Sequence, residues 1–444
     1  MDIPALGADG EYRPRKHDTV RDCAGAAVAE LSMVAPLYIA RTVDAQRQLP
    51  PLPPAQRCAA LAQAREVFGG AGFDDYLTLA SRVSGLPITV TRAGAQAVLD
   101  GLATAFDAIE PARPTGAVLD RRSIGGGAVW ARRGEVLGVH ASGNAPGVHG
   151  LWPQALLLGY RVAVRPSRRE PFTGHRLVQA LRASGFRPGD VTYLPTGHDG
   201  ADELIAAADL SMVYGGADVV DKYAGDATVF PNGPGRAKIL ITAEQDWRAH
   251  LDVVVDSIAA VGGTACVNAT AVLYEGDPRP LAQALGARLK AMAPLPLSDP
   301  HAVLPAQPLD TAHATARLVR RAGAAATPIL GADQVVADLG DGQAVLRPAV
   351  HLLGEPEPDT LNVELPFPCV WVAPWRRNEI APLRNSLVLT AITDDEALVD
   401  RLLAEPTITN LYVGPVPTHH SEPAIPHDGF LADFLMRNKG FSRR

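Results

Sequence analysis

The chain has 444 residues, a hydrophobic fraction of 47%, a charged fraction of 20% and a formal net charge of −7. This length predicts two or three domains with ordinary apolar cores, and the acidic balance without a long basic run argues against a nucleic-acid partner. No stretch of about 18 apolar residues occurs and no apolar leader opens the chain, so we expect a cytoplasmic protein that does not cross a membrane.

Cysteine and histidine usage limits the metal chemistry. The four cysteines are too few and too scattered for a disulfide framework or a paired-cysteine metal site. They are Cys23, Cys58, Cys266 and Cys369. The 12 histidines show no HExxH spacing, and we interpret His419 and His420, in a proline-rich segment, as part of a solvated loop. We therefore expect no metal.

The first hundred residues predict a helical layer with little visible chemistry. Residues 1–20 are polar, and we expect little order in them. The prolines of residues 50–54 interrupt the helical pattern. The expected helices lie at residues 20–48, 55–68, 74–82 and 91–109.

Residues 121–135 differ in character from their surroundings. Gly125, Gly126 and Gly127 interrupt the segment, and the following Ala-Val-Trp-Ala-Arg is typical of an extended strand. An arm that leaves the domain and returns, and an ordinary surface hairpin, both fit this pattern.

A regular alternation of strands and helices begins at residue 136. Four such units predict a parallel sheet that helices cover on both faces. Ligands bind such sheets at the loops that follow the strands. The expected strands are residues 136–140, 161–165, 191–194 and 210–214, and the helices are residues 148–159, 171–184, 201–208 and 218–224.

A second α/β region follows residue 237, and its pattern contains no internal repeat. It opens with a strand at 238–241, a long helix at 243–260 and a strand at 271–274. Further helices are expected at residues 280–292, 311–322 and 394–404, with strands at residues 334–339, 369–372, 386–393 and 407–413. The last thirty residues are rich in proline.

The first loop with marked chemistry covers residues 141–147. Ser142 and Gly143 are small enough for a ligand to approach the backbone. Asn144 offers an amide donor, which suits a developing oxyanion because it cannot lose its proton to it. A simple helix cap by Asn144 is the alternative interpretation.

Two further loops suit phosphate groups. Arg165, Ser167 and Arg168 stand at the carboxyl end of a strand, where guanidinium groups can pair with phosphate, although a solvated charge run is the alternative. The other loop precedes a helix, where a pyrophosphate could rest on the backbone. It consists of Tyr214, Gly215, Gly216 and Ala217. A GxGxxG fingerprint is absent from the first strand–helix unit.

Glu364 and Phe367 belong to a Glu-Leu-Pro-Phe-Pro turn in the second region. The carboxylate of Glu364 could hold a ribose diol, and a solvated loop glutamate is the alternative. Cys266 follows a helix that the glycine pair Gly262 and Gly263 ends. A cysteine among small residues at such a junction can act as a nucleophile, but most single cysteines are small buried hydrophobes.

In order and spacing these segments resemble the aldehyde dehydrogenase superfamily, and within it the acyl-CoA reductases of the LuxC type. The matching segments are Gly-Val-His-Ala-Ser-Gly-Asn-Ala-Pro-Gly (138–147), Val-Ala-Val-Arg-Pro-Ser (162–167), Val-Tyr-Gly-Gly (213–216), Gly-Gly-Thr-Ala-Cys (262–266) and Glu-Leu-Pro-Phe-Pro (364–368). The resemblance covers about residues 20–415. It implies two doubly wound α/β domains: a cofactor-binding domain (1–118 and 137–236) and a catalytic domain (237–413), with an extended oligomerisation arm (119–136) and a C-terminal tail (414–444).

The resemblance also implies roles for single residues. Cys266 matches the catalytic thiol, and Asn144 together with the Cys266 N–H matches the oxyanion hole. Arg165 and Ser167 stand where the family binds the adenosine ribose, although most members have lysine at the first position. Glu364 matches the glutamate that holds the nicotinamide ribose. The turn at residues 214–217 matches the loop on the pyrophosphate side.

One departure from the family bears on the reaction. Aldehyde-oxidising members carry a glutamate that activates water just before the strand leading into the cysteine helix. Alignment places Pro231 or Asn232 there, with no carboxylate nearby. Loss of a general base should slow water attack by about 10²–10⁴-fold, which favours reduction of a thioester over release of an acid. Substitution by Glu244 is the alternative explanation.

A second departure bears on the cofactor. NAD-preferring relatives usually place glutamate at the position of Arg168, where its charge repels a 2′-phosphate. A guanidinium pairs with phosphate, so we expect NADP(H), with NAD(H) as the alternative. An arginine that stacks on adenine without choosing between the cofactors also fits.

The sequence thus predicts an NAD(P)H-dependent enzyme that reduces an acyl thioester, carried by CoA or an acyl carrier protein, to an aldehyde through an acyl-cysteine. The alternatives are oxidation of an aldehyde to an acid or thioester, and reduction of an acyl phosphate. We expect a homodimer, as is usual in the family. The C-terminus does not clearly contain the apolar strand that the family often uses for oligomerisation.

Overall fold

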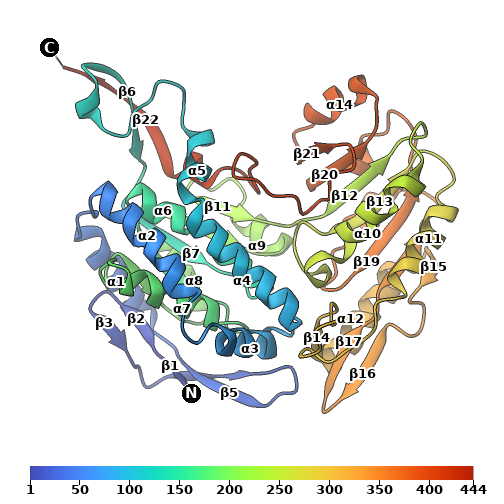
Figure 1. The fold of residues 1–444 in the computed structure, drawn as a ribbon, viewed down its shortest axis with the longest axis horizontal. Coiled ribbons are helices and arrows are strands. Elements are labelled where there is room, and N and C mark those ends of the chain that lie inside the picture. Colours follow the sequence, from blue (N-terminus) through green and yellow to red (C-terminus); the bar gives the residue numbers. More distant parts are fainter. Residues whose placement is uncertain (444) are drawn as a thin grey trace.

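The computed structural model describes residues 1–443 and shows two α/β lobes (Figure 1). The sheet of the first lobe has the order β11-β10-β7-β8-β9-β2-β3. Its parallel strands are β7 (Val136–His140), β8 (Arg161–Arg165), β9 (Val191–Tyr193), β10 (Leu210–Tyr214) and β11 (Val229–Asn232). Two short antiparallel strands, β2 (Ala5–Gly7) and β3 (Gly10–Tyr12), extend one edge.

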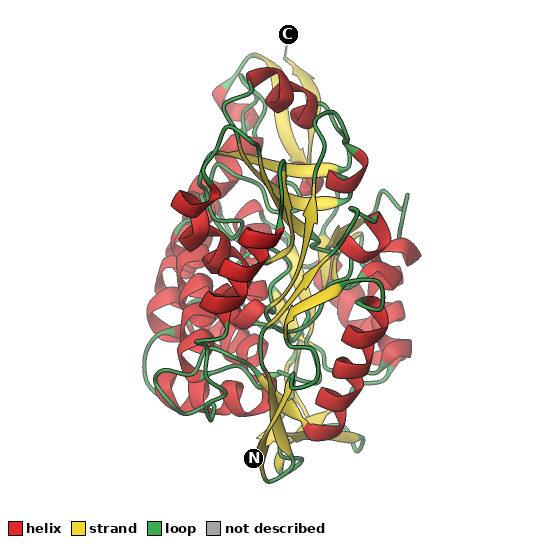
Figure 2. Cartoon of the chain, turned by 90° about the vertical axis from the view of Figure 1, so that its right-hand side faces the viewer, coloured by secondary structure: helices red, strands yellow, loops and turns green. Residues whose placement is uncertain are grey.

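Helices cover both faces of this sheet. Figure 2 views the strands of the molecule edge-on, with helices on either side of them. One layer pairs α1 (Pro36–Gln48) with α8 (His198–Ala207). The opposite layer contains α2 (Pro54–Phe68), α3 (Phe73–Ser84), α4 (Ile88–Ala103), α5 (Ala105–Ile109), α6 (Pro153–Leu158) and α7 (Phe172–Ala183). The short α9 (Ala217–Lys222) follows β10.

The second lobe is built on a sheet of the order β15-β18-β19-β13-β12-β20-β21. Its strands are β12 (Ala237–Ile241), β13 (Ala269–Tyr274), β15 (Thr327–Leu330), β18 (Ala349–Leu352), β19 (Cys369–Pro374), β20 (Ser386–Ile392) and β21 (Ile408–Val413). Leu240 packs into the apolar core on one face, whereas Ile239 and Ile241 pack into the core on the other. Both faces are therefore buried, as expected of parallel strands between helices.

The helices of the second lobe are α10 (Leu251–Ala259), α11 (Arg279–Leu289), α12 (Leu309–Ala322), α13 (Pro358–Leu361) and α14 (Glu396–Leu403). A small antiparallel sheet joins β14 (Ala306–Pro308), β17 (Gln343–Leu346) and β16 (Val336–Gly340). Among residues 1–443, no helix combines the length and the apolar character that a membrane crossing requires. The fold class is thus the predicted pair of α/β domains.

The N-terminal prediction is wrong. Residues 1–20 are ordered, and residues 20–48 do not form one helix. They contain β1 (Asp2–Ile3), β4 (His17–Arg21) and β5 (Ala27–Ser32), which form a small sheet of the order β1-β5-β4, and α1 begins only at Pro36. The alanines of residues 26–29 suggest a helix locally, but pairing with β1 and β4 decides the conformation of β5.

Two predicted helices are broken. Residues 91–109 form α4 and α5 with an interruption at Thr104, and residues 243–260 form a 3₁₀ turn (Trp247–His250) followed by α10. The predicted helix at 148–159 likewise begins as a 3₁₀ turn (Pro146–His149) and continues as α6. In each case the elements are shorter than the apolar periodicity indicates.

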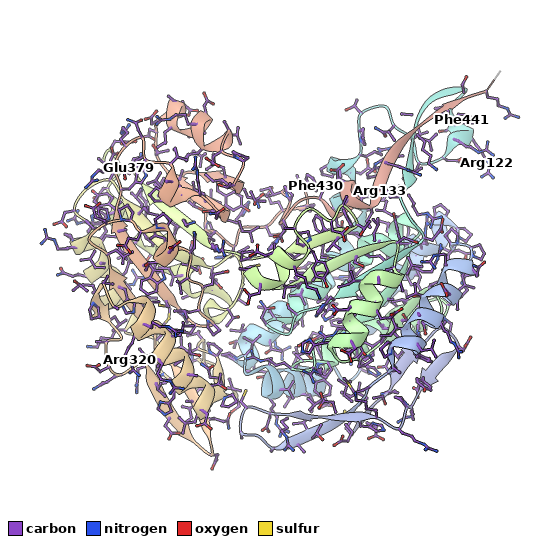
Figure 3. All side chains as sticks on the ribbon, turned by 180° about the vertical axis from the view of Figure 1, so that it is seen from behind. Arg122, Arg133, Arg320, Glu379, Phe430 and Phe441 are labelled. Carbon is purple, nitrogen blue, oxygen red and sulfur yellow. The ribbon has the colours of Figure 1, made fainter. Side chains whose placement is uncertain are left out.

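The segment at 121–135 forms β6 (Gly126–Arg132), and its antiparallel partner is β22 (Met436–Ser442) at the C-terminal end. We name this two-stranded unit the terminal ribbon. It projects from the first lobe in Figure 1, and Figure 3 shows Arg122 and Phe441 at its outer end. The C-terminal segment therefore does end in a strand, although a largely polar one.

The chain reaches the ribbon by crossing between the lobes. Residues 414–430 leave β21 of the second lobe, and α15 (Leu431–Leu435) inserts Leu431, Ala432 and Leu435 into the core of the first lobe. We name residues 414–430 the crossing segment. The three inserted side chains are no more than 1% exposed. Burying two leucines contributes roughly 3–6 kcal/mol, which holds the end of the crossing segment in place.

Candidate active site

A cleft of about 1030 Å³ lies between the two lobes. Its walls come from the loops after β7 and β10, the loop that carries Cys266, the turn at Glu364 and the crossing segment. Ser142, Asn144, Cys266, Glu364 and Phe367 all line it, together with Tyr214, Gly215 and Gly216. Residues that lie far apart in the sequence therefore share one cavity.

The loop before Cys266 has an unusual backbone. Val261, Gly262 and Gly263 have φ angles of 53°, 69° and 68°, which lie in the left-handed region. A Cβ atom at Gly263 would lie 2.4 Å from the Pro368 nitrogen, so the loop packs directly on the Phe367-Pro368 turn. Only glycine fits there, and this contact fixes the cysteine loop against the Glu364 turn.

Asn268 also fixes the same loop, through hydrogen bonds of its side-chain amide. Its Oδ1 accepts a hydrogen bond from the Ala265 N–H at 2.8 Å, and its Nδ2 donates to the carbonyl oxygens of Ala260 (2.8 Å) and Ser257 (3.2 Å). Asn268 is 5% exposed, so its amide is a buried crosslink between α10 and the cysteine loop. The sequence pattern alone gives no indication of this role.

The side chain that contacts the Cys266 sulfur is that of His427, in the crossing segment. The Cys266 Sγ lies 3.3 Å from His427 Nε2, and His427 Nδ1 is hydrogen-bonded to the Asp428 carboxylate. Asp428 Oδ1 also accepts from the Gly233 N–H at 2.9 Å. The three side chains form a Cys–His–Asp chain that the sequence analysis missed.

Electrostatics favours a charged His427. Burial alone would lower its pKa, but the adjacent Cys266 sulfur and the Asp428 carboxylate offset burial and raise the pKa well above the usual value for histidine. A positively charged imidazole stabilises a thiolate beside it. The contact of Cys266 Sγ with His427 Nε2 is therefore one that a nucleophilic cysteine could use.

The second lobe holds the crossing segment so that His427 meets the cysteine. Asn410 of β21 donates its Nδ2 to the His427 carbonyl oxygen at 2.6 Å, and the Thr418 N–H donates to Ser257 Oγ at 3.1 Å. His419 and His420 also line the cleft, and they stand in a loop with partly exposed side chains. The sequence signal available was the His-Asp dipeptide at 427–428 in a proline-rich segment.

Asn144 faces the cysteine loop. Its Nδ2 donates to the Thr264 carbonyl oxygen at 3.2 Å, and its Oδ1 accepts from Ser142 Oγ at 2.5 Å. The serine thus fixes which end of the amide points toward the cysteine. The remaining N–H of Asn144 is suited to stabilise an oxyanion at a carbonyl that Cys266 attacks.

Glu364 lies beside the same loop. Both of its carboxylate oxygens accept from the Gly235 N–H, at 3.1 and 3.2 Å. The surrounding protein raises its pKa by desolvation, and the backbone N–H groups and charge at Gly235 and Arg236 oppose that rise. A Cβ at Gly235 would lie 1.8 Å from the Cys266 carbonyl oxygen, so Glu364 and Cys266 both contact this glycine.

No residue of β11 is a carboxylate, although the carboxylates of Asp428 and Glu364 accept from the N–H groups of Gly233 and Gly235 just beyond it. Pro231 and Asn232 stand at the end of this strand, and Asn232 contributes an amide to the cleft wall. Glu244 cannot substitute, because it lies beyond the carboxyl end of β12, with hydrogen bonds from Thr242 Oγ1 (2.6 Å) and Thr393 Oγ1 (3.0 Å). The base nearest to Cys266 is therefore His427.

Arg165 is a buried cation at the carboxyl end of β8. It is 7% exposed, its Nη1 donates to His140 Nε2 at 2.8 Å, and its Nε has no partner. Within residues 1–443 no carboxylate forms an ion pair with it. Burial lowers the pKa of Arg165 to about 10, and burial together with Arg165 lowers the pKa of His140 to about 4. A buried guanidinium beside a neutral imidazole has a place for an anion.

The remaining predicted cofactor residues fall into two groups. A Cβ at Gly143 would lie 2.4 Å from Ser167 Oγ, so their loops touch, and a Cβ at Gly216 would meet open space, which leaves the backbone before Ala217 accessible. Arg168 is separate from them, because it pairs on the surface with Asp18 at 3.2 Å. The glycines and the unpaired Arg165 fit a dinucleotide along the strand ends of the first lobe.

Comparison with known proteins places this site in a family. Residues 12–381 match the sequence model of the aldehyde dehydrogenase family, which is most of the chain. The protein therefore belongs to the aldehyde dehydrogenase family and is an oxidoreductase that acts on aldehyde groups. The family uses NAD(P). Among residues 1–443, no cluster of three or more metal-ligating side chains occurs.

Solved structures show the same fold at low sequence identity. The aldehyde dehydrogenase KauB from Pseudomonas aeruginosa has a TM-score of 0.84 and 15% identity, over 99% of this chain and 96% of that one. Aldehyde dehydrogenase 21 from Physcomitrella patens, in complex with succinate, has a TM-score of 0.82 and 16% identity, over 100% and 98%. An indole-3-acetaldehyde dehydrogenase with NAD+ has a TM-score of 0.83 and 16% identity, over 99% and 96%. No curated protein sequence matches this chain.

Proposed function

We propose that this enzyme reduces an acyl thioester to an aldehyde through an acyl-Cys266 intermediate, as in the LuxC-type acyl-CoA reductases. The observation that carries the proposal is the contact of Cys266 Sγ with His427 Nε2 in a cleft where β11 ends without a carboxylate. A histidine suits the exchange of one thiol for another because it can give and take a proton near neutral pH.

The first half-reaction needs only residues of this chain. The Cys266 thiolate attacks the thioester carbon, and the Asn144 amide and the Cys266 N–H stabilise the oxyanion. The bond from carbon to the carrier sulfur then breaks, and the departing thiolate takes the proton of the His427 imidazolium. The products are acyl-Cys266, a free carrier thiol and neutral His427, which regains a proton from solvent.

The second half-reaction releases the aldehyde. A reduced nicotinamide, when bound, would supply the hydride that the acyl carbon requires. The resulting hemithioacetal alkoxide is stabilised by Asn144 and collapses as its bond to the Cys266 sulfur breaks. Cys266 returns as a thiolate, and the overall reaction consumes one solvent proton for each thioester reduced.

We further propose NADP(H) as the preferred cofactor, with NAD(H) as the alternative. The support is Arg165, which is buried and has no carboxylate partner among the described residues, together with the absence of a carboxylate at position 168. Arg168 itself contributes less than the sequence suggests, because Asp18 already pairs with it.

Oxidation of an aldehyde is the second candidate. Two observations favour it: the similar solved structures are aldehyde dehydrogenases, and His427 lies close enough to Cys266 to activate water at an acyl-cysteine. The product separates the two reactions. Acid formed from an aldehyde and NAD(P)+ without added thiol would support this candidate.

The test of the proposal combines thioesters with NADPH. We expect loss of NADPH absorbance, formation of aldehyde, and an acyl adduct on Cys266 detected by intact mass when NADPH is omitted. Cys266→Ala should abolish all three, whereas Cys58→Ala, at an exposed cysteine of α2, serves as the control. Turnover that persists in Cys266→Ala would overturn the mechanism.

The substrate carrier and the assembly are further proposals. CoA and an acyl carrier protein both present a thioester at the end of a flexible arm, which suits the open cleft. We also propose a homodimer, because a two-stranded unit such as the terminal ribbon is marginal alone and has unpaired edges. Light scattering of the full chain and of a variant without β22 would test this.

A further inference from the structure

The lining of the cleft extends from the cysteine loop to helices of the first lobe, and we name this part the branch. Residues of α4, α5, α6 and α15 line it. Most of its side chains are small or apolar, and Asp100 of α4 adds one carboxylate. The small or apolar residues include Gly101, Thr104, Ala108, Leu151, Phe430 and Leu431. Figure 3 places Phe430 where the crossing segment meets the first lobe.

The small residues have a packing explanation of their own. A Cβ at Gly101 would lie 2.4 Å from the Gly150 carbonyl oxygen, and one at Gly94 would lie 2.8 Å from Pro146 Cδ. α4 thus approaches the turn before α6 closely, and glycine is required for that approach. These residues shape the branch, but they do not indicate what enters it.

Gln154 of α6 is different from the other residues of the branch. It is 7% exposed and lines the cleft, yet within residues 1–443 its side chain makes no hydrogen bond. An amide has two N–H donors and an acceptor oxygen, and none of these Gln154 atoms is among the fully buried polar atoms that lack a partner, so the amide opens into the cleft. A ligand that enters the branch can therefore reach an amide that no side chain of the protein occupies.

We propose that Gln154 hydrogen-bonds an oxygen on the acyl group of the substrate, so that the enzyme prefers acyl thioesters that carry a hydroxyl or oxo group along the chain. This inference rests on the proposed function and names its substrate class. Because His427 contacts the Cys266 sulfur and Asn144 bonds the cysteine loop, we place this oxygen further along the acyl chain than the thioester carbon.

The preference follows from what happens to the Gln154 amide when an acyl chain fills the branch. A plain alkyl chain displaces water and leaves the Gln154 amide unsatisfied, which costs about 1–3 kcal/mol, or roughly 5–150-fold in rate. A chain with a correctly placed oxygen avoids that cost. Sites built to bond a substrate hydroxyl discriminate strongly against analogues that lack it.

The test compares octanoyl-CoA with its hydroxyl and oxo analogues, substituted near the thioester or at the chain end. The full-length protein is used without cofactor, and intact mass follows acylation of Cys266. We expect a chain-end or mid-chain oxygen to accelerate acylation by at least about fivefold over octanoyl-CoA. Gln154→Leu should remove the preference and accelerate the plain chain.

The control is Gln63→Leu, the same substitution at an exposed position of α2, which should keep the wild-type preference. If Gln154→Leu fails to fold, Gln154→Met keeps the length of the side chain and serves in its place. Equal acylation of all the thioesters by the wild-type protein would overturn the inference and leave the proposed function standing.

Matched aldehydes separate the two hypotheses. In one outcome, no thioester acylates Cys266, but oxygenated octanals are oxidised with NADP+ at least about fivefold faster than octanal, and Gln154→Leu removes that difference. This result would contradict thioester reduction and support the Gln154 site. If neither thioesters nor aldehydes show a preference for oxygen, a water molecule satisfies Gln154 and the inference is wrong.

Discussion

Two histidines, one at the end of β7 and one in the crossing segment, have opposite surroundings. His140 stands at the end of β7 against the Arg165 guanidinium, at 2.8 Å, and burial and that charge lower its pKa to about 4. His427 stands in the crossing segment against Cys266 and Asp428, which together raise its pKa well above the usual value. The surroundings therefore favour a neutral imidazole at His140 and a charged one at His427.

The difference shows what each of the two surroundings is suited to bind. Neutral His140 accepts a hydrogen bond from Arg165 and so orients a guanidinium without cancelling its charge, which leaves that charge for an anion. A charged His427 suits a thiolate beside it and, in the proposed reaction, releases its proton to the departing thiolate. One histidine, His140, thus orients a neighbouring charge, whereas the other, His427, is suited to transfer a proton.

Removal of His427 should have the largest effect. His427→Gln is expected to slow acylation of Cys266 by about 10²–10⁴-fold, because the proton donor and the partner of the thiolate are both lost. Intact mass over time with an acyl-CoA measures this rate. NADPH affinity should stay unchanged in the same variant. An acylation rate close to that of the wild type would show that His427 is only structural.

Removal of Arg165, beside His140, should have the next largest effect. Arg165→Met is expected to weaken NADPH binding by about 10–100-fold through loss of a charge-assisted bond, with a smaller effect on NADH. It should also raise the pKa of His140, which NMR titration of the ring protons would detect. Calorimetric titration with 2′-AMP and 5′-AMP would locate the missing phosphate contact. Unchanged affinity for 2′-AMP would show that Arg165 meets no 2′-phosphate.

Asp428→Asn tests the His427 environment more finely. The asparagine can still accept from the Gly233 N–H, but the negative charge beside His427 is lost. We expect about a tenfold slower acylation and a lower pKa for His427, so that the alkaline limb of the pH–rate profile moves to lower pH. A profile that keeps its alkaline limb would place the relevant proton elsewhere.

The smallest expected effect is on the pH dependence of the free energy of unfolding, and it has opposite signs for His140 and His427. The folded pKa of His140 is below the unfolded value, so its contribution is lost as pH falls from about 6.5 toward 4. The folded pKa of His427 is raised, so its contribution is complete below the unfolded value and is lost as pH rises through the folded one. Urea unfolding of His140→Gln and His427→Gln should therefore flatten the acid and alkaline sides respectively. The same change in both variants would contradict this.

The parts of the site that lie at strand ends were predictable from sequence. Asn144, Cys266 and Glu364 stand in short loops between regular elements, where strand and helix periodicity locates them without tertiary information. The order of these loops also predicts the two α/β domains. Residues such as Asn268 were not predictable, because an amide that crosslinks a loop looks like any other polar residue.

The missing parts depend on contacts that are distant in sequence. His427 meets Cys266 across 161 residues, and no local pattern reports such a contact. β5 pairs with β1 and β4, and β6 pairs with β22, so their conformation comes from partners and not from their own propensity. The Arg168 prediction shows the same limit, since Asp18, which pairs with it, is 150 residues away.

Because the crossing segment lies late in the sequence, Cys266 and His427 are synthesised at different times. A ribosome that adds about 5–20 residues per second completes His427 roughly 10–30 seconds after Cys266. During that interval the cysteine loop can form while its imidazole partner does not yet exist. The nascent protein therefore carries Cys266 without its imidazole partner through most of synthesis, and the contact with His427 can form only after β21, the last strand of the second lobe, has been made.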